Sequence, residues 1–225
     1  MSTPAPSGSP AAAPEPYPFG TGQAEAPATV GGLAPVVRKI ETDKRYVFLT
    51  IDDGEVRDPA APDLIATSGA RPTLFLNERY FRPAPEYFRD IQERGHSVIG
   101  DHTVNHPNLR GKPYALQHKE ICDDAAAEAA DFGQRPTLFR PPYGNYDDTT
   151  RRAAADCGMA ALVLWTAAVN DGVVQFQAGD HLRPGDIVLM HFRKTFTADY
   201  QAFLHRATQD GLTPVPLSDF LTPRH

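Results

Sequence analysis

Acidic and imidazole side chains that could perform hydrolytic chemistry recur along the chain at short spacings. Asp52 and Asp53 are adjacent, whereas His102 and His106 lie four residues apart, a spacing at which two imidazoles can bind one ion. Two imidazoles and one carboxylate leave coordination positions open on a cation, as a catalytic metal site requires. A second carboxylate and a separate histidine, His191, would supply the acid and base for hydrolysis of an acyl bond.

Each of these patterns also has an ordinary structural explanation when it is taken alone. An Asp-Asp-Gly sequence most often forms a turn. His191 would more often be a hydrogen-bonded structural histidine, and Arg140 could anchor its loop through a salt bridge. The metalloprotease motif HExxH is excluded, because Thr103 stands at the position of its Glu. The combination of these groups, and not any one of them, favours a catalytic metal centre.

Composition narrows the class of protein. The chain has 225 residues and is 41% hydrophobic, which is typical of one globular domain. Its net charge of -6 argues against a nucleic-acid partner, because neutralising phosphates requires clustered Lys and Arg. No stretch reaches the roughly 18 consecutive apolar residues of a membrane span, so we predict no transmembrane segment in this chain.

The beginning of the chain differs in composition from the rest. Its first 35 residues contain 8 of the 22 prolines, interspersed with Ala, Ser, Gly and Thr, and such a segment buries too little apolar surface to fold. We therefore interpret residues 1–36 as a flexible linker or tether and residues 37–225 as one folded domain. Our hypothesis is that a secretion signal or anchor precedes the linker, which places the protein outside the cytoplasm, secreted or tethered to the cell surface.

The two cysteines, Cys122 and Cys157, form no CxxC pair, which excludes a structural zinc knuckle. Any metal must therefore be bound by His and carboxylate side chains. The two thiols could form one disulfide or remain buried as two small hydrophobic groups. The sequence gives no distance between them and leaves both alternatives open.

The elements that must position the reactive groups follow an alternating pattern. Short apolar runs, typical of buried parallel strands, occur at Tyr46–Ile51, Thr73–Leu76, Ser97–Gly100, Thr137–Phe139, Ala160–Trp165 and Ile187–Met190. Helices are predicted between them at Ala61–Ser68, Pro85–Glu93, Pro113–Phe132, Asp147–Cys157 and Ala198–Gln209. The pattern predicts an α/β fold, a distorted (β/α) barrel with about seven parallel strands.

In parallel α/β folds, reactive groups gather where strands end, because the loops there meet at one face. Five predicted strands are followed at once or shortly afterwards by ionisable or polar side chains. These are Asp52 and Asp53, Asp101 and His102, Arg140, Asn170 and Asp171, and His191. The sequence therefore predicts one rim that carries all of these groups.

At these positions the chain resembles the polysaccharide deacetylases of carbohydrate esterase family 4, which carry the NodB homology domain. Four motifs appear in the order of the family over roughly Arg45 to Leu221. Thr50-Ile51-Asp52-Asp53-Gly54 is similar to TFDDG, and His102-Thr103-Val104-Asn105-His106 is similar to H-S/T-x-x-H. Arg140-Pro141-Pro142-Tyr143-Gly144 is similar to RxPY, and Leu189-Met190-His191 is similar to LxH. The fold of that family, a distorted (β/α) barrel with fewer than eight units, agrees with the strand count.

The resemblance implies a role for each matching residue. Asp53, His102 and His106 would bind one divalent ion, Zn²⁺ in first place with Co²⁺ or Ni²⁺ as alternatives. Asp52 would be the general base and His191 the general acid. The Tyr143 N–H would donate to the oxyanion, and Arg140 would orient the base. Asp171 would be the acid that pairs with His191.

The chain departs from the family in one segment. The family usually has D-x-x-D-W after the strand that ends at Trp165, whereas this chain has Ala168-Val169-Asn170-Asp171-Gly172. Asp171 retains the second acid, but Ala168 replaces the first and Gly172 replaces a groove-lining Trp. Loss of an indole removes a large stacking surface, so we expect the chemistry to survive and the substrate contacts to differ.

The function implied is metal-dependent removal of acetyl groups from a polysaccharide by a monomeric hydrolase. The preferred substrate class is an N-acetylglucosamine-containing glycan, chitin-like or peptidoglycan. One alternative is O-deacetylation, as in an acetylxylan esterase, since both reactions pass through a tetrahedral intermediate. Another is a non-catalytic glycan-binding wall module, suggested by the altered Ala168–Gly172 segment.

Overall fold

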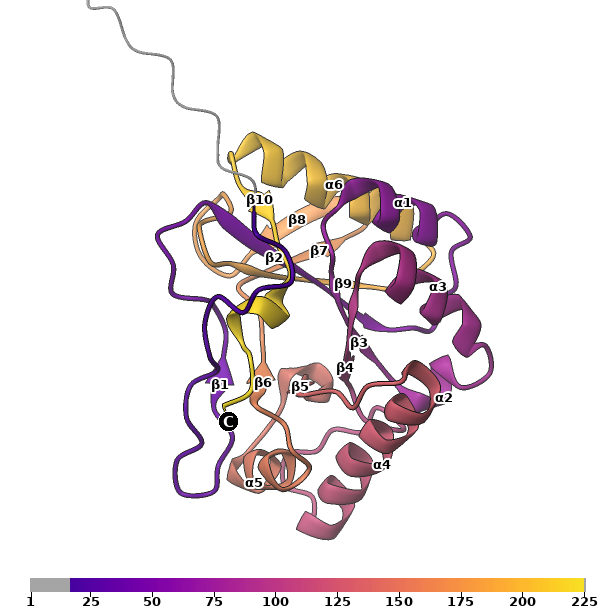
Figure 1. Cartoon of the computed structure of the whole chain (residues 1–225), viewed down its shortest axis with the longest axis vertical. Coiled ribbons are helices and arrows are strands. Elements are labelled where there is room, and N and C mark those ends of the chain that lie inside the picture. Colours follow the sequence, from indigo (N-terminus) through magenta and orange to yellow (C-terminus); the bar gives the residue numbers. More distant parts are fainter. Residues whose placement is uncertain (1–16, 225) are drawn as a thin grey trace, which may run out of the picture.

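A mostly parallel β-sheet, curled into an incomplete barrel, forms the centre of the protein in a computed structural model that describes residues 17–224 (Figure 1). The sheet order is β1-β6-β5-β4-β3-β2-β9-β7-β8, and β10 pairs with β2. Every pairing is parallel except that of β7 with β8. The strands are β1 (Val36–Val37), β2 (Tyr46–Asp53), β3 (Thr73–Leu76), β4 (Val98–Asp101), β5 (Leu138–Phe139), β6 (Ala161–Val163), β7 (Ala167–Asn170), β8 (Val173–Phe176), β9 (Ile187–His191) and β10 (Thr213–Pro214).

Helices connect the strands and cover the sheet. In Figure 1, α1, α3 and α6 lie over one part of the sheet and α4 and α5 over another. The helices are α1 (Ala61–Ser68), α2 (Glu78–Phe81), α3 (Pro85–Gly95), α4 (Tyr114–Phe132), α5 (Asp148–Asp156) and α6 (Phe196–Gln209), with 3₁₀ turns at Pro142–Gly144 and Leu217–Phe220. Within residues 17–224, none of these helices combines the length and the apolar character needed to cross a bilayer.

The predicted α/β fold is confirmed. All six predicted strands and all five predicted helices occur, with ends shifted by no more than two residues. β1, β10, α2 and the β7–β8 hairpin were not predicted. β1 and β10 are too short for a periodic signal, with two residues each, and β8 is largely exposed and lacks an apolar run.

Burial on both faces explains why the central strands are nearly continuous in hydrophobic character. β3 is buried along its whole length, and β2 and β9 are buried except near their ends. Parallel strands covered by helices on both sides have no solvent face to occupy with polar residues. The polar residues are therefore confined to the carboxyl ends of β2 and β9, where Asp52 and His191 pair in register.

The segment predicted to be a linker is in part packed against the domain. Residues 1–16 lie outside the described residues, whereas Tyr17 stacks with Phe220 and its hydroxyl donates to Asp219 at 2.9 Å. The Ala26 N–H donates to the Thr222 carbonyl at 2.9 Å. Part of the predicted linker, including Tyr17 and Ala26, therefore packs against the C-terminal segment, because these contacts offset its low apolar content.

Cys122 and Cys157 form a disulfide that joins α4 to the residue after α5. Of the two alternatives left open by the sequence, the tertiary structure therefore selects the disulfide. The two residues are 35 positions apart in the sequence, so the bond closes a loop of substantial length.

We expect a Cys122→Ala/Cys157→Ala double variant to lose about 3 kcal/mol of unfolding free energy, because the cross-link restricts the unfolded chain over a loop of this length. Urea denaturation followed by circular dichroism measures the change. Wild-type protein under reducing conditions should match the double variant. Equal stability of oxidised wild type and variant would show that the bond contributes nothing.

Candidate catalytic site

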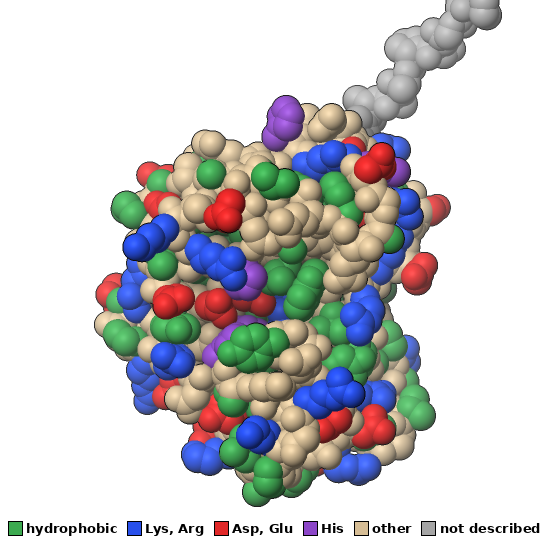
Figure 2. All heavy atoms as spheres, turned by 180° about the vertical axis from the view of Figure 1, so that it is seen from behind, with side chains coloured by type: hydrophobic (Ala, Val, Ile, Leu, Met, Phe, Trp, Pro, Cys, Tyr) green, Lys and Arg blue, Asp and Glu red, His purple; other side chains and the backbone are tan. Residues whose placement is uncertain are grey.

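A cavity of about 330 Å³ lies at the carboxyl ends of β2, β4 and β9. Six of the predicted site residues line this cavity, and the remaining lining residues were not predicted. The lining consists of Asp52, Asp53, His102, His106, Pro141, Tyr143, Gly144, Trp165, Leu189, His191 and Arg193. On the face drawn in Figure 2, histidine, acidic and basic side chains lie together beside hydrophobic ones. The cavity therefore brings together side chains that follow β2, β4 and β9, whereas Asp101, Arg140, Asn170 and Asp171 are not among its lining residues.

Asp53, His102 and His106 form a group that fits a metal ion. Asp53 Oδ1 lies 3.6 Å from His102 Nε2 and 3.5 Å from His106 Nε2. Ligand atoms bound tetrahedrally at about 2.1 Å from an ion are about 3.4 Å apart, close to these separations. Asp53 Oδ1 is buried without a hydrogen-bond partner among the described residues. A cation would satisfy that oxygen, so the residues present fit the group.

Hydrogen bonds fix the orientation of the His102 ring. Its Nδ1–H donates to the Arg140 carbonyl at 2.6 Å, which leaves the unprotonated Nε2 facing Asp53. Burial lowers the pKa of His102 to about 3, so the ring is neutral as a metal ligand must be. The Asn77 side-chain amide donates to the carbonyls of His102 and Thr103. Such contacts behind the ligands determine their direction.

The loops that carry the site adopt a backbone conformation that is uncommon for residues other than glycine. Asp53, Thr103, His106 and Tyr143 have φ angles of 76°, 74°, 58° and 61°. Positive φ at non-glycine residues is unfavourable and persists where the surrounding structure imposes it. At His106 the surrounding contact is a hydrogen bond from its N–H to Thr103 Oγ1 at 3.0 Å. Three of these four residues, Asp53, His106 and Tyr143, line the cavity.

Arg140 holds Asp52 in place from beneath the cavity. Its Nη1 donates to Asp52 Oδ1 at 2.6 Å and to Thr50 Oγ1 at 2.7 Å, and its Nε donates to the Val163 carbonyl. The guanidinium is fully buried and lies over the Phe75 ring at 4.4 Å. Burial lowers the pKa of Arg140, and the Asp52 carboxylate opposes that shift. With Oδ1 engaged, Asp52 Oδ2 lies 3.7 Å from His102 Nε2.

The electrostatic surroundings of Asp53 also favour a cation next to its carboxylate. Burial raises the pKa of Asp53, and the neighbouring Asp52 raises it further, whereas His102 and His106 lower it. A cation between these side chains would favour the ionised carboxylate, because opposite charge at short range counters the effect of burial. The site therefore has the ligand types, the separations and the charge that a divalent cation requires.

His191 lines the cavity, but its predicted partner is elsewhere. Burial lowers the pKa of His191 to about 4, and its Nδ1 is buried without a hydrogen-bond partner in the described part of the chain. Asp171 is exposed in the turn between β7 and β8. The predicted pairing of Asp171 with His191 is therefore wrong in this structure.

The β7–β8 hairpin explains why Asp171 does not reach His191. Asn170 pairs with Val173, so Asp171 and Gly172 form a two-residue turn, with φ angles of 51° and 74°. Asp-Gly is a strong signal for a type I′ hairpin turn, which requires positive φ at both positions. The spacing from Trp165 matched a family motif, but the local turn preference placed the acid in solvent.

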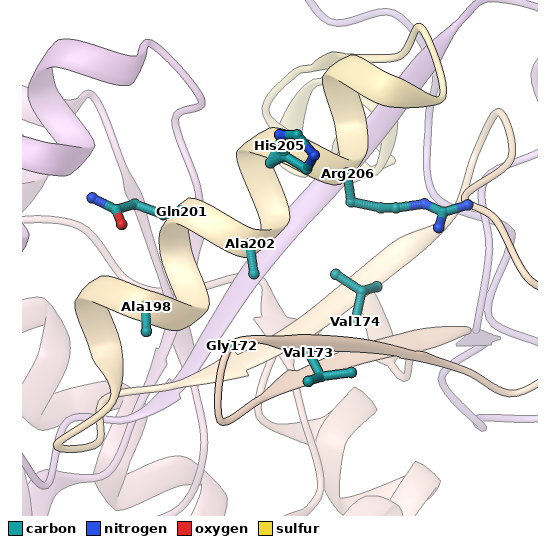
Figure 3. Close-up of a pocket in the computed structure, with 8 residues that line it drawn as sticks. All are labelled: Gly172, Val173, Val174, Ala198, Gln201, Ala202, His205 and Arg206. Carbon is teal, nitrogen blue, oxygen red and sulfur yellow. The ribbon is translucent and has the colours of Figure 1, made fainter.

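Gly172 borders a different pocket, of about 600 Å³, between the hairpin and α6 (Figure 3). The side chains that line it are Val173, Val174, Ala198, Gln201, Ala202, His205 and Arg206, which extend from the hairpin and from α6. No carboxylate lines this pocket. Loss of the family's Trp at Gly172 therefore alters a surface next to α6, whereas Trp165 supplies an aromatic side chain to the catalytic cavity.

Tyr143 lies at the mouth of the cavity. Its side chain is 64% exposed, and its ring packs edge-on against the His106 ring with centroids 4.6 Å apart. Its backbone N–H has no hydrogen-bond partner among residues 17–224. The N–H is therefore free to donate to a substrate oxygen.

Sequence reasoning missed Trp165, Leu189 and Arg193 as cavity residues. Arg193 stands two positions after His191, and its Nη1 donates to Asn170 Oδ1 at 3.0 Å. Trp165 was recognised only as the end of a strand and Leu189 only as part of a motif. Their proximity to Asp52 and Asp53 depends on the pairing of β2 with β9 and on the curvature of the sheet.

Comparisons with known proteins agree with this geometry. The family model for polysaccharide deacetylase matches residues 39–162. An uncharacterized protein of Streptomyces coelicolor is 48% identical over 158 residues, which are 69% of this chain and 63% of that protein. The peptidoglycan-N-acetylglucosamine deacetylase PgdA of Listeria monocytogenes is 27% identical over 82% of this chain. The alignment covers only 40% of that relative.

A solved structure supports the fold. The family 4 carbohydrate esterase from Streptomyces lividans, determined in complex with acetate, superposes with a TM-score of 0.68 at 26% identity, over 80% of this chain and 98% of that one. The family match spans more than half of the chain and includes the Asp-Asp pair, both imidazoles and Arg140. The chain belongs to the polysaccharide deacetylase family.

Proposed function

We propose that this protein is a metal-dependent hydrolase that removes acetyl groups from a polysaccharide, with an N-acetylglucosamine-containing glycan as its substrate. The observation that carries the proposal is the Asp53, His102 and His106 group beside a carboxylate, Asp52, that Arg140 orients. Family membership supports a deacetylase. The relative PgdA, 40% of which is aligned with this chain, is named a peptidoglycan-N-acetylglucosamine deacetylase. This name supports the choice of glycan.

The proposed chemistry assigns one task to each group. A divalent cation held by Asp53, His102 and His106 would supply Lewis acidity that polarises the acetyl carbonyl and lowers the pKa of the attacking water. Asp52 accepts the proton of that water through Oδ2, the oxygen that Arg140 leaves free. The Tyr143 N–H donates to the oxyanion as it forms. His191 then protonates the departing amine as the general acid.

The donor set favours Zn²⁺ in first place, with Co²⁺ or Ni²⁺ as alternatives, because two imidazoles and one carboxylate suit these ions. We also propose a monomer that acts outside the cytoplasm. The Cys122–Cys157 disulfide supports that location, since disulfides persist in oxidising compartments.

De-N-acetylation and O-deacetylation use the same catalytic groups, and acetyl esters are the second candidate substrate. We expect acetate release from N-acetylglucosamine oligomers or peptidoglycan to exceed release from acetylxylan. Asp52→Asn, which keeps the shape of the side chain but removes the base, should lower kcat by about 10²-fold or more. Acetate is measured enzymatically, and the metal content of the variant is checked by elemental analysis.

Two outcomes would change the assignment. Greater release from acetylxylan would make the protein an O-deacetylase. Absence of release from any substrate by metal-loaded wild type would favour a glycan-binding module.

Metal binding should raise the stability of the folded protein. We expect Zn²⁺ at 100 times its Kd to raise the unfolding free energy by about 2.7 kcal/mol, observed as a higher Tm in differential scanning fluorimetry. Asp53→Asn should remove most of this response, because the variant lacks the anionic ligand. An equal Zn²⁺ response in this variant would place the ion elsewhere.

The corrected position of Asp171 gives a separate prediction. Asp171→Asn should change kcat by less than about twofold, because the side chain is exposed in a turn that Asn also tolerates. His191→Asn should lower kcat by about 10²-fold with little change in KM, since it removes a proton donor. Steady-state kinetics on one oligosaccharide decides both. A large loss in Asp171→Asn would restore the pairing expected from the motif.

A further inference from the structure

Three carboxyl side chains lie buried together behind the loop that carries the imidazoles. Asp101 ends β4, and Asp124 and Glu128 lie one turn apart on α4. Each of the three residues is 0% exposed, and one oxygen from each lies within 4.8 Å of the others. None of them forms an ion pair with Lys or Arg within residues 17–224.

The hydrogen bonds of the cluster are unevenly distributed. Asp101 Oδ1 accepts from the Thr103 N–H at 3.0 Å, and both oxygens of Asp124 accept from backbone N–H groups. Asp101 Oδ2 and both oxygens of Glu128 are buried with no partner in the described part of the chain. A buried carboxylate without a counter-charge strongly destabilises a fold. Glu128 in particular is a fully buried acid, and neither of its oxygens is hydrogen-bonded to any of residues 17–224.

We propose that Asp101, Asp124 and Glu128 bind a second cation, Ca²⁺, distinct from the ion at Asp53, His102 and His106. The new site offers only carboxylate oxygens, which hard cations prefer, and lacks the imidazole and thiolate donors that favour Zn²⁺. Calcium binds oxygens at about 2.4 Å, so its ligands lie up to about 4.8 Å apart, in agreement with the observed grouping. Glu128 can bind through both free oxygens.

The second cation would stabilise the catalytic loop from behind. Asp124 Oδ2 accepts from the His102 N–H at 3.1 Å, and Asp124 Oδ1 accepts from the Glu78 N–H at 2.8 Å. The acids therefore tie α4 to the start of α2 and to the loop after β4. A cation among them would fix the backbone from which both imidazoles extend, without contacting the substrate.

The test separates the two metal sites by using the Asp53→Asn protein, which lacks the anionic ligand of the first. The protein is unfolded in chelator, refolded with Ca²⁺, with Mg²⁺ or without a divalent ion, and desalted. We expect one equivalent of Ca²⁺ per chain by elemental analysis. After Ca²⁺ is added back to 100 times its Kd, we also expect a Tm about 5 °C or more above that of the ion-free sample.

Matched variants on the same helix localise the ion. Glu128→Gln in the Asp53→Asn background should lose both the bound Ca²⁺ and the shift in Tm. Asp123→Asn should keep both, because Asp123 is exposed on the outer face of α4 and pairs with Lys119.

The proposal is wrong if the refolded Asp53→Asn protein retains no Ca²⁺ and its Tm is independent of divalent ions, in which case protons neutralise the acids. Retention of Mg²⁺ in preference to Ca²⁺, or unchanged Ca²⁺ binding in Glu128→Gln, would also overturn it. If Glu128→Gln fails to refold, the Ca²⁺ titration of the Asp53→Asn protein alone decides.

Discussion

The arrangement of the site depends on Arg140, a buried cation that contacts the ends of β2, β4 and β6. Its guanidinium binds Asp52 on β2, its carbonyl accepts from the His102 ring, and its N–H donates to the Asp101 carbonyl on β4. An arginine fork is rigid and permanently charged, so it can orient a carboxylate through directed hydrogen bonds even when it is fully buried. The positions of Asp52, the proposed base, and His102, a proposed metal ligand, are thereby coupled through a single residue.

The two adjacent aspartates illustrate how one strand end supplies different chemistry. Asp52 is buried at 3% exposure and bound to Arg140, whereas Asp53 turns outward with positive φ toward the imidazoles. Neighbouring residues of a strand point to opposite sides, and the change of backbone at Asp53 redirects its carboxylate into the cavity. Burial without a paired cation raises the pKa of Asp53, so the geometry favours a bound ion there and a proton acceptor next to it.

Much of the fold and of the site followed from the sequence because the signals were local and repeated. Buried parallel strands gave apolar runs such as Tyr46–Ile51, and Asp52, Asp53, His102 and His191, which follow such runs, line one cavity. The β7–β8 hairpin was missed because β8 alternates between exposed and half-buried residues. Asp171 was misplaced for a related reason: a motif spacing was given precedence over the Asp-Gly turn preference, which determines where that side chain points.

The sequence by itself determined the types of catalytic group, their order along the chain and the strands that present them, because residue identity and hydrophobic periodicity are properties of the chain alone. Only the tertiary structure decided which groups touch: the Asp53, His102 and His106 separations, the Cys122–Cys157 bond and the burial of Glu128 beside Asp101. These contacts join residues far apart in sequence. They depend on sheet curvature and helix packing, for which no short stretch of sequence carries a signal.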